Sequence, residues 1–501
     1  MPKTKELILD GSSLTIRSLV AASQGKIKVR VSPRALAKVR ECREYVLKAV
    51  SQKKPVYGVN TGFGKLAEQA IDEKDVSLLQ LNLVRSHAAG VGPVMDTPIV
   101  RAAMILRLNT LLKGFSGISV ELVELLKNMV NVDIVPIVPR YGSLGASGDL
   151  APLSYIALSM IGEGNVLHKG KVEAARSALA KEGLKPLVLG AKEGLALING
   201  TQMSCATACA AYVESVRLLD VFDMLAAFSY QALRASREPL DVRIHALRPL
   251  SGQMQEARRL NALLEGSSAL NGSHRVQEPY SLRCVPQVHG AARQALSFVE
   301  DVLTTEINSV TDNPIIFADD HTVLSGGNFH GQPVALCCDM LSMSLVPVGH
   351  LSEKRVEKIL DNSFSGLPAF LASQPGLDSG FMIAQYTAAA VLEECKLRCT
   401  PSSVDTASVS GGQEDHASMS LHASQKALEI VRNLWHVAAV EALCAFRAIE
   451  LANLSKALSP ETSDLYRSLG LEFSKLGHTA PLGQLISASE DVLRRLAGAN
   501  S

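Results

Sequence analysis

Apolar residues recur along most of the chain at the three- and four-residue spacing of an α-helix. From Thr97 onward, Met104, Leu108 and Leu111 return on one helical face until Gly114 ends the pattern. Longer patterns of this kind carry more apolar positions than a surface helix needs, so we expect their helices to be buried in a bundle. They cover residues 203–236, 333–361, 381–398 and 417–456.

Strand-like segments are few. VDIVPIV, at residues 132–138, and a short piece at residues 315–317 have strand character, and residues 170–190 are polar and rich in turn formers. We therefore predict a mainly α fold of two domains. Residues 1–200 form an N-terminal domain that carries glycine-rich loops, and residues 201–501 form a central and C-terminal helical bundle.

The charge of the chain is balanced. Lys and Arg number 50 and Asp and Glu 49 among 501 residues, a formal net charge of +1. This balance leaves no electrostatic footprint for nucleic acid or an anionic membrane, so we expect a small-molecule partner. The N-terminal residues lack a secretory signal, and charges such as Glu214 and Arg217 interrupt the longest apolar helices. We therefore expect a cytoplasmic protein without membrane contact.

Nine cysteines are scattered through apolar stretches, which suits reduced, buried thiols better than a disulfide framework. Cys205 with Cys209, and Cys395 with Cys399, stand four residues apart and could each share a helix face. No cluster of His and Cys in the sequence completes a tetrahedral ligand set, so we expect no metal.

The stretch YGSLGASGDLAPLS, at residues 141–154, sets three small residues, Ala146, Ser147 and Gly148, between flanking glycines. One interpretation is a tight, well-packed loop. A second interpretation is chemical, because the unshielded amide nitrogen of Gly148 can attack the carbonyl carbon of Ala146 and close a five-membered ring. Loss of water from the ring and from the Ser147 hydroxyl then leaves an exocyclic methylidene, which is an electrophile.

A second glycine-rich stretch, YGVNTGFGK at residues 57–65, fits a phosphate-binding loop poorly. The Walker A motif needs Ser or Thr after Gly-Lys, whereas Leu66 follows here, and no strand precedes the stretch as a dinucleotide site requires. A nucleotide-binding module is therefore the weakest alternative.

The loop sequence GSLGASGDLAPLS resembles the prosthetic-group motif of the aromatic amino acid ammonia-lyase family, and seven further blocks resemble its histidine branch in the family's order. These blocks are YGVNTGFG, NLVRSHAAG, EGLALINGTQ, VQEPYSLRCVPQVHGA, TDNPIIF, SGGNFHGQPVA and QEDHASM. The resemblance covers essentially the whole chain. It implies a mainly α fold of the fumarase/aspartase-like superfamily and a homotetramer whose active sites draw residues from neighbouring subunits.

The resemblance also implies that Ala146, Ser147 and Gly148 form 4-methylideneimidazole-5-one (MIO), so that no external cofactor is needed. This group would bond to the amine of the substrate and act as an electron sink. Tyr57 would be the base for the Cβ proton, in a site that favours its phenolate, although a packed loop tyrosine is the structural alternative. Asn199 would hold the prosthetic group and the substrate carboxylate, and a simple Asn-Gly turn is its alternative.

Gln277, Tyr280 and Arg283 lie three residues apart, so on a helix they would project from a common side. Arg283 offers a planar fork for a carboxylate. A solvated helix face is the alternative, but the resemblance implies that all three line the substrate pocket, with Tyr280 among the catalytic residues. Phe329 resembles an aromatic residue near the prosthetic group, although a core Phe would look the same. Asp149 is assigned to shaping the loop during cyclisation.

The choice of substrate is expected to depend on Ser86 and His87. In the family this pair is Ser-His in the histidine enzymes, tends to be Phe-Leu in phenylalanine enzymes, and is His-Leu in bacterial tyrosine enzymes. An imidazole is both a donor and an acceptor, so its pocket needs partners such as His87, which would otherwise be a satisfied core histidine. Glu414 is the second candidate to hold the imidazole or assist proton movement, and Met382 resembles the residue at the flank of the ring. The resemblance therefore implies deamination of L-histidine to trans-urocanate and ammonia.

The chain departs from the family pattern at two positions. Gly412 precedes Gln413 and Glu414 where the family usually has Asn, and Cys395 replaces the Asn of a Glu-Asn-Lys segment. Both departures concern the hydrogen bonding around Glu414. Tyrosine or phenylalanine ammonia-lyase activity and a 2,3-aminomutase are alternatives on the same scaffold, and a non-catalytic helical assembly protein is an alternative of another class.

Overall fold

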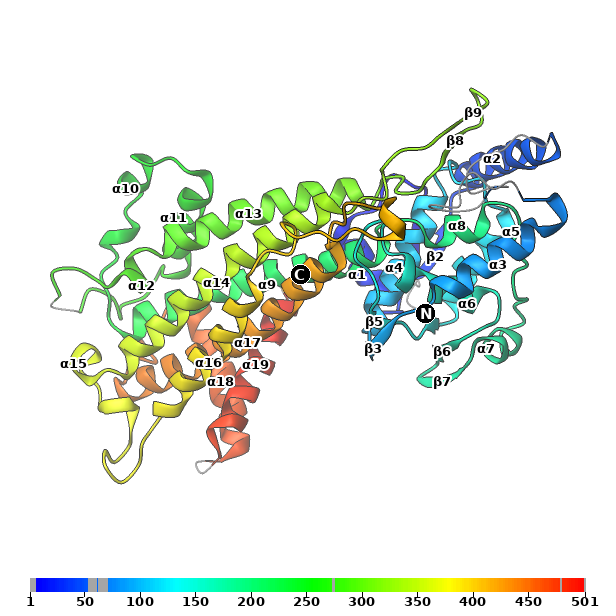
Figure 1. Ribbon diagram of the computed structural model, residues 1–501. Coiled ribbons are helices and arrows are strands. Elements are labelled where there is room, and N and C mark those ends of the chain that lie inside the picture. Colours follow the sequence, from blue (N-terminus) through cyan, green and yellow to red (C-terminus); the bar gives the residue numbers. More distant parts are fainter. Residues whose placement is uncertain (1–5, 53–60, 62–70, 273–274, 478–479, 500–501) are drawn as a thin grey trace. The chain divides into compact units, whose positions relative to one another are not determined.

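A computed structural model describes residues 6–52, 61, 71–272, 275–477 and 480–499 (Figure 1). This part of the chain is mainly α-helical, as predicted, with helices α1 to α19 and short strands β1 to β9. It divides into two compact units. The first unit comprises residues 1–213, 300–339 and 401–425, and the second comprises residues 214–299, 340–400 and 426–501. The domain boundary expected after residue 200 stays a prediction.

The first unit combines helices with short strands. Its helices include α1 (Ile16–Ser23), α2 (Pro33–Ser51), α3 (Val76–His87), α4 (Thr97–Leu111), α5 (Val120–Asn131), α6 (Leu150–Met160), α7 (Ala175–Lys181) and α8 (Glu193–Ile198). Its strands are β1 (Glu6–Leu9), β2 (Lys28–Val31), β3 (Val91–Val94), β4 (Ile134–Pro136), β5 (Pro139–Tyr141), β6 (Asn165–His168), β7 (Lys171–Ala174), β8 (Ile315–Phe317) and β9 (Thr322–Leu324). The strand-like pieces at residues 132–138 and 315–317 are thus confirmed as β4 and β8.

The strands of the first unit form small sheets of two or three strands. β1 pairs with β2 in parallel, and the other pairings, β3 with β5, β4 with β6, β6 with β7 and β8 with β9, are antiparallel. β5 leads directly into the glycine-rich loop, and α6 follows that loop. The loop is therefore anchored at both ends by regular structure.

Helix α4 is surrounded by protein on all sides. It packs against α1 and α5, and every residue from Ile99 to Leu111 is buried. The predicted start at Thr97 is confirmed, and the helix ends before Gly114, whose φ of +79° suits the turn that follows. Because α4 has no solvent face, its Arg107 must find partners inside the unit.

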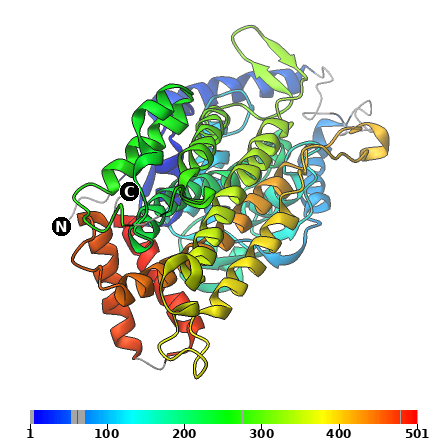
Figure 2. The same cartoon turned by 90° about the vertical axis from the view of Figure 1, so that its left-hand side faces the viewer.

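The second unit is a bundle of long helices. It contains most of α9 (Gln202–Ala232), α13 (Val285–Glu306), α14 (Gln332–Leu360), α16 (Met382–Arg398) and α17 (Ser420–Leu451), which run side by side in Figures 1 and 2. The four long helices expected from apolar periodicity are thus confirmed as α9, α14, α16 and α17. Shorter helices complete the unit: α10 (Val242–Ala246), α11 (Ser251–Leu263), α12 (Tyr280–Arg283), α15 (Asn362–Ser365), α18 (Pro460–Leu476) and α19 (Leu482–Ala499).

A buried ion pair connects three of these long helices. The guanidinium of Arg355 on α14 donates from Nη2 to Oε2 of Glu441 on α17 at 2.7 Å, and both side chains are fully buried. The Ser229 hydroxyl on α9 donates to Oε1 of the same carboxylate at 2.7 Å. Glu441 is thus compensated by a cation and a hydroxyl, as a buried carboxylate requires.

Among the described helices, α14 alone is long and apolar enough to pass a test for a membrane span by length and composition. However, 61% of its most apolar window is buried inside the protein. A core helix of a bundle passes the same test, because it is apolar on more than one face. The burial of α14 therefore fits a core helix.

Candidate active site

The loop at residues 142–149 makes a sharp turn that only glycine can complete. Gly148 has a φ of +74° and forms a bridge with Gly200, which follows α8. A Cβ on Gly148 would lie 2.3 Å from the carbonyl oxygen of Gly200, and the amide of Asp149 donates to that same oxygen at 2.7 Å. Ala146 is buried and Ser147 is half-buried. The three small residues therefore form a constrained turn against Gly200.

Asn199 lies directly against this turn. Its Nδ2 donates to the carbonyl oxygen of Ser147 at 2.9 Å, and its own Oδ1 is buried without a hydrogen-bond partner among the described residues. Arg107 holds the backbone of Asn199, because its Nη1 donates to the Asn199 carbonyl oxygen at 2.7 Å and to Oε1 of Gln202 at 2.7 Å. The structure thus brings Ser147 and Asn199 together as predicted, and adds Arg107 as a support.

The carboxylate of Asp149 is fully buried beneath the loop. Its Oδ1 accepts from the hydroxyls of Ser204 at 2.7 Å and Ser143 at 3.1 Å, and its Oδ2 accepts from the amide of Ser204 at 2.7 Å. Burial raises the pKa of Asp149, and the hydrogen bonds from Ser204 and Ser143 oppose that rise. These bonds connect the end of the loop to the start of α9.

The residues just before α17 cover the other side of the loop. The Ser418 hydroxyl donates to the carbonyl oxygen of Gly145 at 3.0 Å, and the amide of Met419 donates to the carbonyl oxygen of Leu144 at 2.8 Å. The hydroxyls of Ser420 and Ser204 lie 2.9 Å apart. Sequence reasoning missed these serines, because a serine alone carries no chemical signal, although Ser418 falls within the QEDHASM block.

His87, at the end of α3, is half-buried rather than a core histidine. Its Nδ1 lies 2.8 Å from the carbonyl oxygen of Leu83 and 3.2 Å from the hydroxyl of Ser86. A carbonyl oxygen only accepts, so Nδ1 carries the proton in this contact and Nε2 is left with a lone pair in the neutral ring. His87 is therefore oriented as an acceptor for an N–H donor.

Phe329 and Glu414 lie on neighbouring segments of the first unit. Both are half-buried, so Phe329 is not an ordinary core residue of this chain. The rings of His330 and His416 meet edge to face with centroids 5.4 Å apart, and His330 Nε2 lies 3.4 Å from the carbonyl oxygen of His416. These two histidines, each in a block with a predicted residue, connect the segments and were missed from the sequence.

Gln277, Tyr280 and Arg283 belong to the second unit and do come together. Arg283 Nη1 donates to Oε1 of Gln277 at 2.7 Å, and the guanidinium lies 4.7 Å from the centroid of the Tyr280 ring. The expectation that one helix carries all three is wrong. α12 begins at Tyr280 because Pro279 precedes it, and proline favours the helix start over its interior, so Gln277 lies in a bend before the helix.

Two further predicted residues are placed as follows. Met382 is the first residue of α16, in the second unit, and is half-buried. Tyr57 lies outside the described residues, so its assignment stays a prediction. The loop, Asn199, His87, Phe329 and Glu414 all belong to the first unit.

Comparison with known proteins identifies the family. The family model for aromatic amino acid lyases matches residues 14–470. The chain belongs to this family. It is 43% identical to a histidine ammonia-lyase of Alkaliphilus oremlandii over 94% of this chain and 93% of that protein.

Two solved structures are also similar to this lyase. The histidine ammonia-lyase of Trypanosoma cruzi matches with a TM-score of 0.91 and 39% identity, over 98% of this chain and 94% of that one. The tyrosine aminomutase of Streptomyces globisporus matches with a TM-score of 0.93 and 34% identity, over 99% and 98%. The fold and length of the family are thus shared over almost the whole chain.

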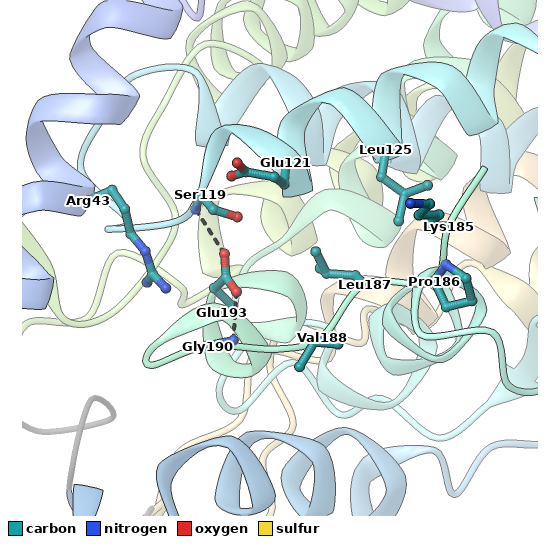
Figure 3. A pocket seen from close by; sticks show the side chains of 10 residues that line it. All are labelled: Arg43, Ser119, Glu121, Leu125, Lys185, Pro186, Leu187, Val188, Gly190 and Glu193. Carbon is teal, nitrogen blue, oxygen red and sulfur yellow. Dashed lines mark hydrogen bonds between the residues drawn. The ribbon is translucent and has the colours of Figure 1, made fainter. Parts of the chain in front are cut away.

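A separate hollow of about 400 Å³ lies in the first unit of this lyase (Figure 3). Its lining includes Arg43 and Glu193 and none of the predicted site residues. The carboxylate of Glu193 accepts from the amides of Ser119 at 2.8 Å and Gly190 at 2.7 Å, drawn as dashed lines. Ser119 caps α5. Glu193 therefore ties the start of that helix to the loop before α8, which is a structural role.

In the described part of the lyase, one group of three side chains has the spacing of metal ligands, namely Asp223, Glu256 and His289 of the second unit. Arginines already contact the carboxylates of this group. Arg293 contacts both carboxylates, and Arg259 Nε lies 2.9 Å from Oδ2 of Asp223. A cation would have to displace these guanidinium groups, so the cluster is an ion network rather than a metal site.

Proposed function

We propose that this lyase is a histidine ammonia-lyase, which removes ammonia from L-histidine without oxidation and forms trans-urocanate. The observation that carries the proposal is the constrained Ala146-Ser147-Gly148 turn, held at its centre by Asn199. The full-length similarity to histidine ammonia-lyases supports the choice of substrate.

The residues of the turn fit the MIO prosthetic group that they would form. Ring closure needs a backbone nitrogen without a side chain beside it, and the space at Gly148 admits no Cβ. The carbonyl oxygen of Ser147 remains on the ring, and it accepts the Asn199 amide at 2.9 Å. When formed, this group supplies an electron-poor alkene that makes the amino group of the substrate able to leave. No external cofactor is then needed.

The substrate carboxylate and side chain would each have partners among the residues of this sequence, drawn from one subunit or its neighbours. Arg283 would bind the carboxylate with its planar fork, with Gln277 and Tyr280 beside it. Nε2 of His87 would accept the N–H of the substrate imidazole, because Nδ1 already donates to the Leu83 carbonyl oxygen. Glu414 would be a second acceptor for that ring.

Proton removal from Cβ is assigned to Tyr57. A phenol with a pKa of about 10 is mostly protonated at neutral pH, so the surroundings of Tyr57 must favour the phenolate. Phe329 would contact the prosthetic group, and Met382 would contact the flank of the substrate ring. Asp149 takes no part in turnover in this proposal, because its oxygens are engaged by Ser204 and Ser143 beneath the loop.

We also propose a cytoplasmic homotetramer whose subunits complete one another's active sites. Long helices of the described chain expose apolar side chains that a subunit contact would cover. On α14, Leu336 and Met343 are each 47% exposed, and on α16 Ile383 and Tyr386 are 54% and 61% exposed. Light scattering tests this assembly, and a monomeric mass in an active preparation would contradict it.

The decisive assay supplies L-histidine, L-tyrosine and L-phenylalanine separately and follows the conjugated acrylate and ammonia. We expect turnover of histidine, and we expect Ser147→Ala to lower kcat by orders of magnitude while the fold is kept. The similarity to a tyrosine aminomutase favours a 2,3-aminomutase as the second candidate. A β-amino acid product would support that candidate, and absence of histidine turnover would contradict the first.

A further inference from the structure

Serine hydroxyls hold the prosthetic-group loop at both of its ends. Ser204, at the start of α9, bonds to Asp149 just after the turn, and Ser418, just before α17, bonds to Gly145 just before it. Both serines are fully buried. Residues that are more than 200 positions apart in the sequence therefore fix the two sides of one short turn.

The contacts leave no space for larger groups. A Cβ on Gly145 would lie 2.3 Å from the hydroxyl oxygen of Ser418, and Gly145 has a φ of +71°. A Cβ on Gly331 would lie 2.4 Å from the hydroxyl oxygen of Ser420. Two glycines from separate loops thus make room for the hydroxyls, which shows a built arrangement rather than a chance proximity.

The direction of each hydrogen bond follows from its acceptor. The Asp149 carboxylate can only accept, so the Ser204 hydroxyl donates to it. Ser420 must then donate to Ser204 across their 2.9 Å contact. The Ser418 hydroxyl donates to the carbonyl oxygen of Gly145 at 3.0 Å. The hydroxyl protons of Ser204 and Ser418 are thus donated to the loop, and that of Ser420 is donated to Ser204.

We propose that Ser204 and Ser418 are positioning residues for the ring closure that makes the prosthetic group. Ser418 holds the Gly145 side of the turn, and Ser204 holds the carboxylate of Asp149 on the other side. The turn between them is kept bent, which favours the approach of the Gly148 nitrogen to the Ala146 carbonyl carbon. This inference rests on the proposed function, because it concerns how that electrophile forms.

Formation of the prosthetic group closes one ring and releases two waters. The Gly148 nitrogen bonds to the Ala146 carbonyl carbon, whose oxygen leaves as water with the protons of the Gly148 and Ser147 nitrogens, and a double bond forms between that carbon and the Ser147 nitrogen. The Ser147 hydroxyl leaves as the second water with the Cα hydrogen, and Cα and Cβ become doubly bonded. No oxidant is needed.

Ring closure is expected only after distant parts of the chain have folded together. Ser418 belongs to residues 401–425, which are distant from the loop in sequence but pack in the first unit with it. Ring closure should therefore follow the docking of that segment, and it should slow when the hydroxyl contact is removed. The loss of one buried hydrogen bond corresponds to about a tenfold lower rate.

The test is the intact mass of Ser204→Ala and Ser418→Ala over time after purification, with absorption of the conjugated ring as a second readout. Ser424→Ala is the matched control, because this buried hydroxyl on α17 donates to Leu421 of its own helix at 2.9 Å. The wild type and the control should lack the mass of two waters. Each test variant should lose these waters about tenfold more slowly, and the double variant about a hundredfold.

Circular dichroism and thermal unfolding verify that each variant is folded before its mass is measured. Each substitution by alanine removes a single oxygen atom, so little disturbance of the fold is expected. Folded variants that lose both waters as fast as the control would overturn the inference and leave the proposed function intact. A wild type that turns over histidine at its full encoded mass would overturn the inference and the proposed prosthetic group, but not the deamination of histidine. Slow water loss in the two folded test variants, with normal water loss in the Ser424→Ala control, would support the inference.

Discussion

One backbone contact orients His87, the residue to which we assign substrate preference. Its Nδ1 is held by the Leu83 carbonyl oxygen at 2.8 Å, so its Nε2 accepts and suits the N–H of an imidazole. We predict that His87→Leu lowers kcat/KM for L-histidine by roughly tenfold to a hundredfold, the loss of one hydrogen bond to the ring. Initial rates on histidine measure this effect. His321→Leu, exposed on the β8–β9 hairpin, is the control, and equal rates for both variants would contradict the role of His87.

The Lys192–Asp312 pair is buried inside the first unit, where neither charge can be left without the other. Nζ of Lys192 lies 3.0 and 2.9 Å from the two carboxylate oxygens, and both side chains are fully buried. We predict that Asp312→Asn lowers the free energy of unfolding by about 3 to 5 kcal/mol, because it leaves a buried ammonium without its counter-ion. Urea denaturation measures this change. The double change Lys192→Met with Asp312→Leu should recover most of it, and a double variant as weak as Asp312→Asn would refute the explanation.

The burial of Glu256 predicts that stability depends on pH. Burial, followed by the charge of Asp223, raises the pKa of Glu256 from 4.5 to about 7. Asp220 and Asp223 are balanced by Arg259 and Arg293, so a neutral Glu256 leaves the cluster uncharged and an ionised one adds an unbalanced negative charge. His289 stays neutral, because burial lowers its pKa to about 3.

A raised carboxyl pKa means that the folded state binds the proton more tightly than the unfolded state. The free energy of unfolding should therefore fall as pH rises from 4.5 to about 7, by at most about 1.4 kcal/mol per pH unit, and level off above. We predict that Glu256→Gln flattens this part of the profile in urea melts. Glu265→Gln, at an exposed side chain, should not, and a profile unchanged by Glu256→Gln would contradict the assignment.

At the scale of elements, α11 and α13 approach each other through two glycines. A Cβ on Gly290 would lie 2.5 Å from the backbone nitrogen of Gln253, and one on Gly252 would lie 2.1 Å from the carbonyl oxygen of Gly290. We predict that Gly290→Ala destabilises the protein by about 1 to 3 kcal/mol, because backbone cannot move aside cheaply. Gly470→Ala, on α18 with ordinary contacts only, should stabilise it by up to about 1 kcal/mol. Thermal unfolding compares the two, and a stabilised Gly290→Ala would show that the helices separate easily.

The elements that sequence predicted best are those with long apolar periodicity. The spacing of apolar residues predicted α9, α14, α16 and α17, because buried positions recur along the whole length of each helix. The expectation of one helix through Gln277, Tyr280 and Arg283 failed at the start of the helix, because Pro279 sets the N-terminal boundary of α12. Short, proline-bounded elements carry too few periodic positions to be placed from sequence.

The loop itself could be anticipated from the sequence, but its supports could not. Ala146, Ser147 and Gly148 stand out as adjacent small residues, and the family resemblance pointed to Asn199. Ser204 and Ser418 are distant from the loop in sequence, and a hydroxyl becomes meaningful only when folding brings it to a carboxylate or carbonyl. Such contacts depend on tertiary structure, so no spacing rule finds them.

For the molecule as a whole, the two compact units are assembled from interleaved segments. The first unit takes residues 300–339 and 401–425 from beyond its main stretch. Apolar periodicity describes each helix but not which distant helix it packs against, so the sequence could predict helices without predicting this interleaving. The same interleaving brings Ser418 to the glycine-rich loop and Gly331 to Ser418 and Ser420.

The most direct test of the account is the intact mass of purified protein that turns over L-histidine. The account predicts a mass lower than that of the encoded 501 residues by two water molecules, with the loss confined to the peptide that contains Ser147. An active enzyme that retains the full encoded mass would contradict it.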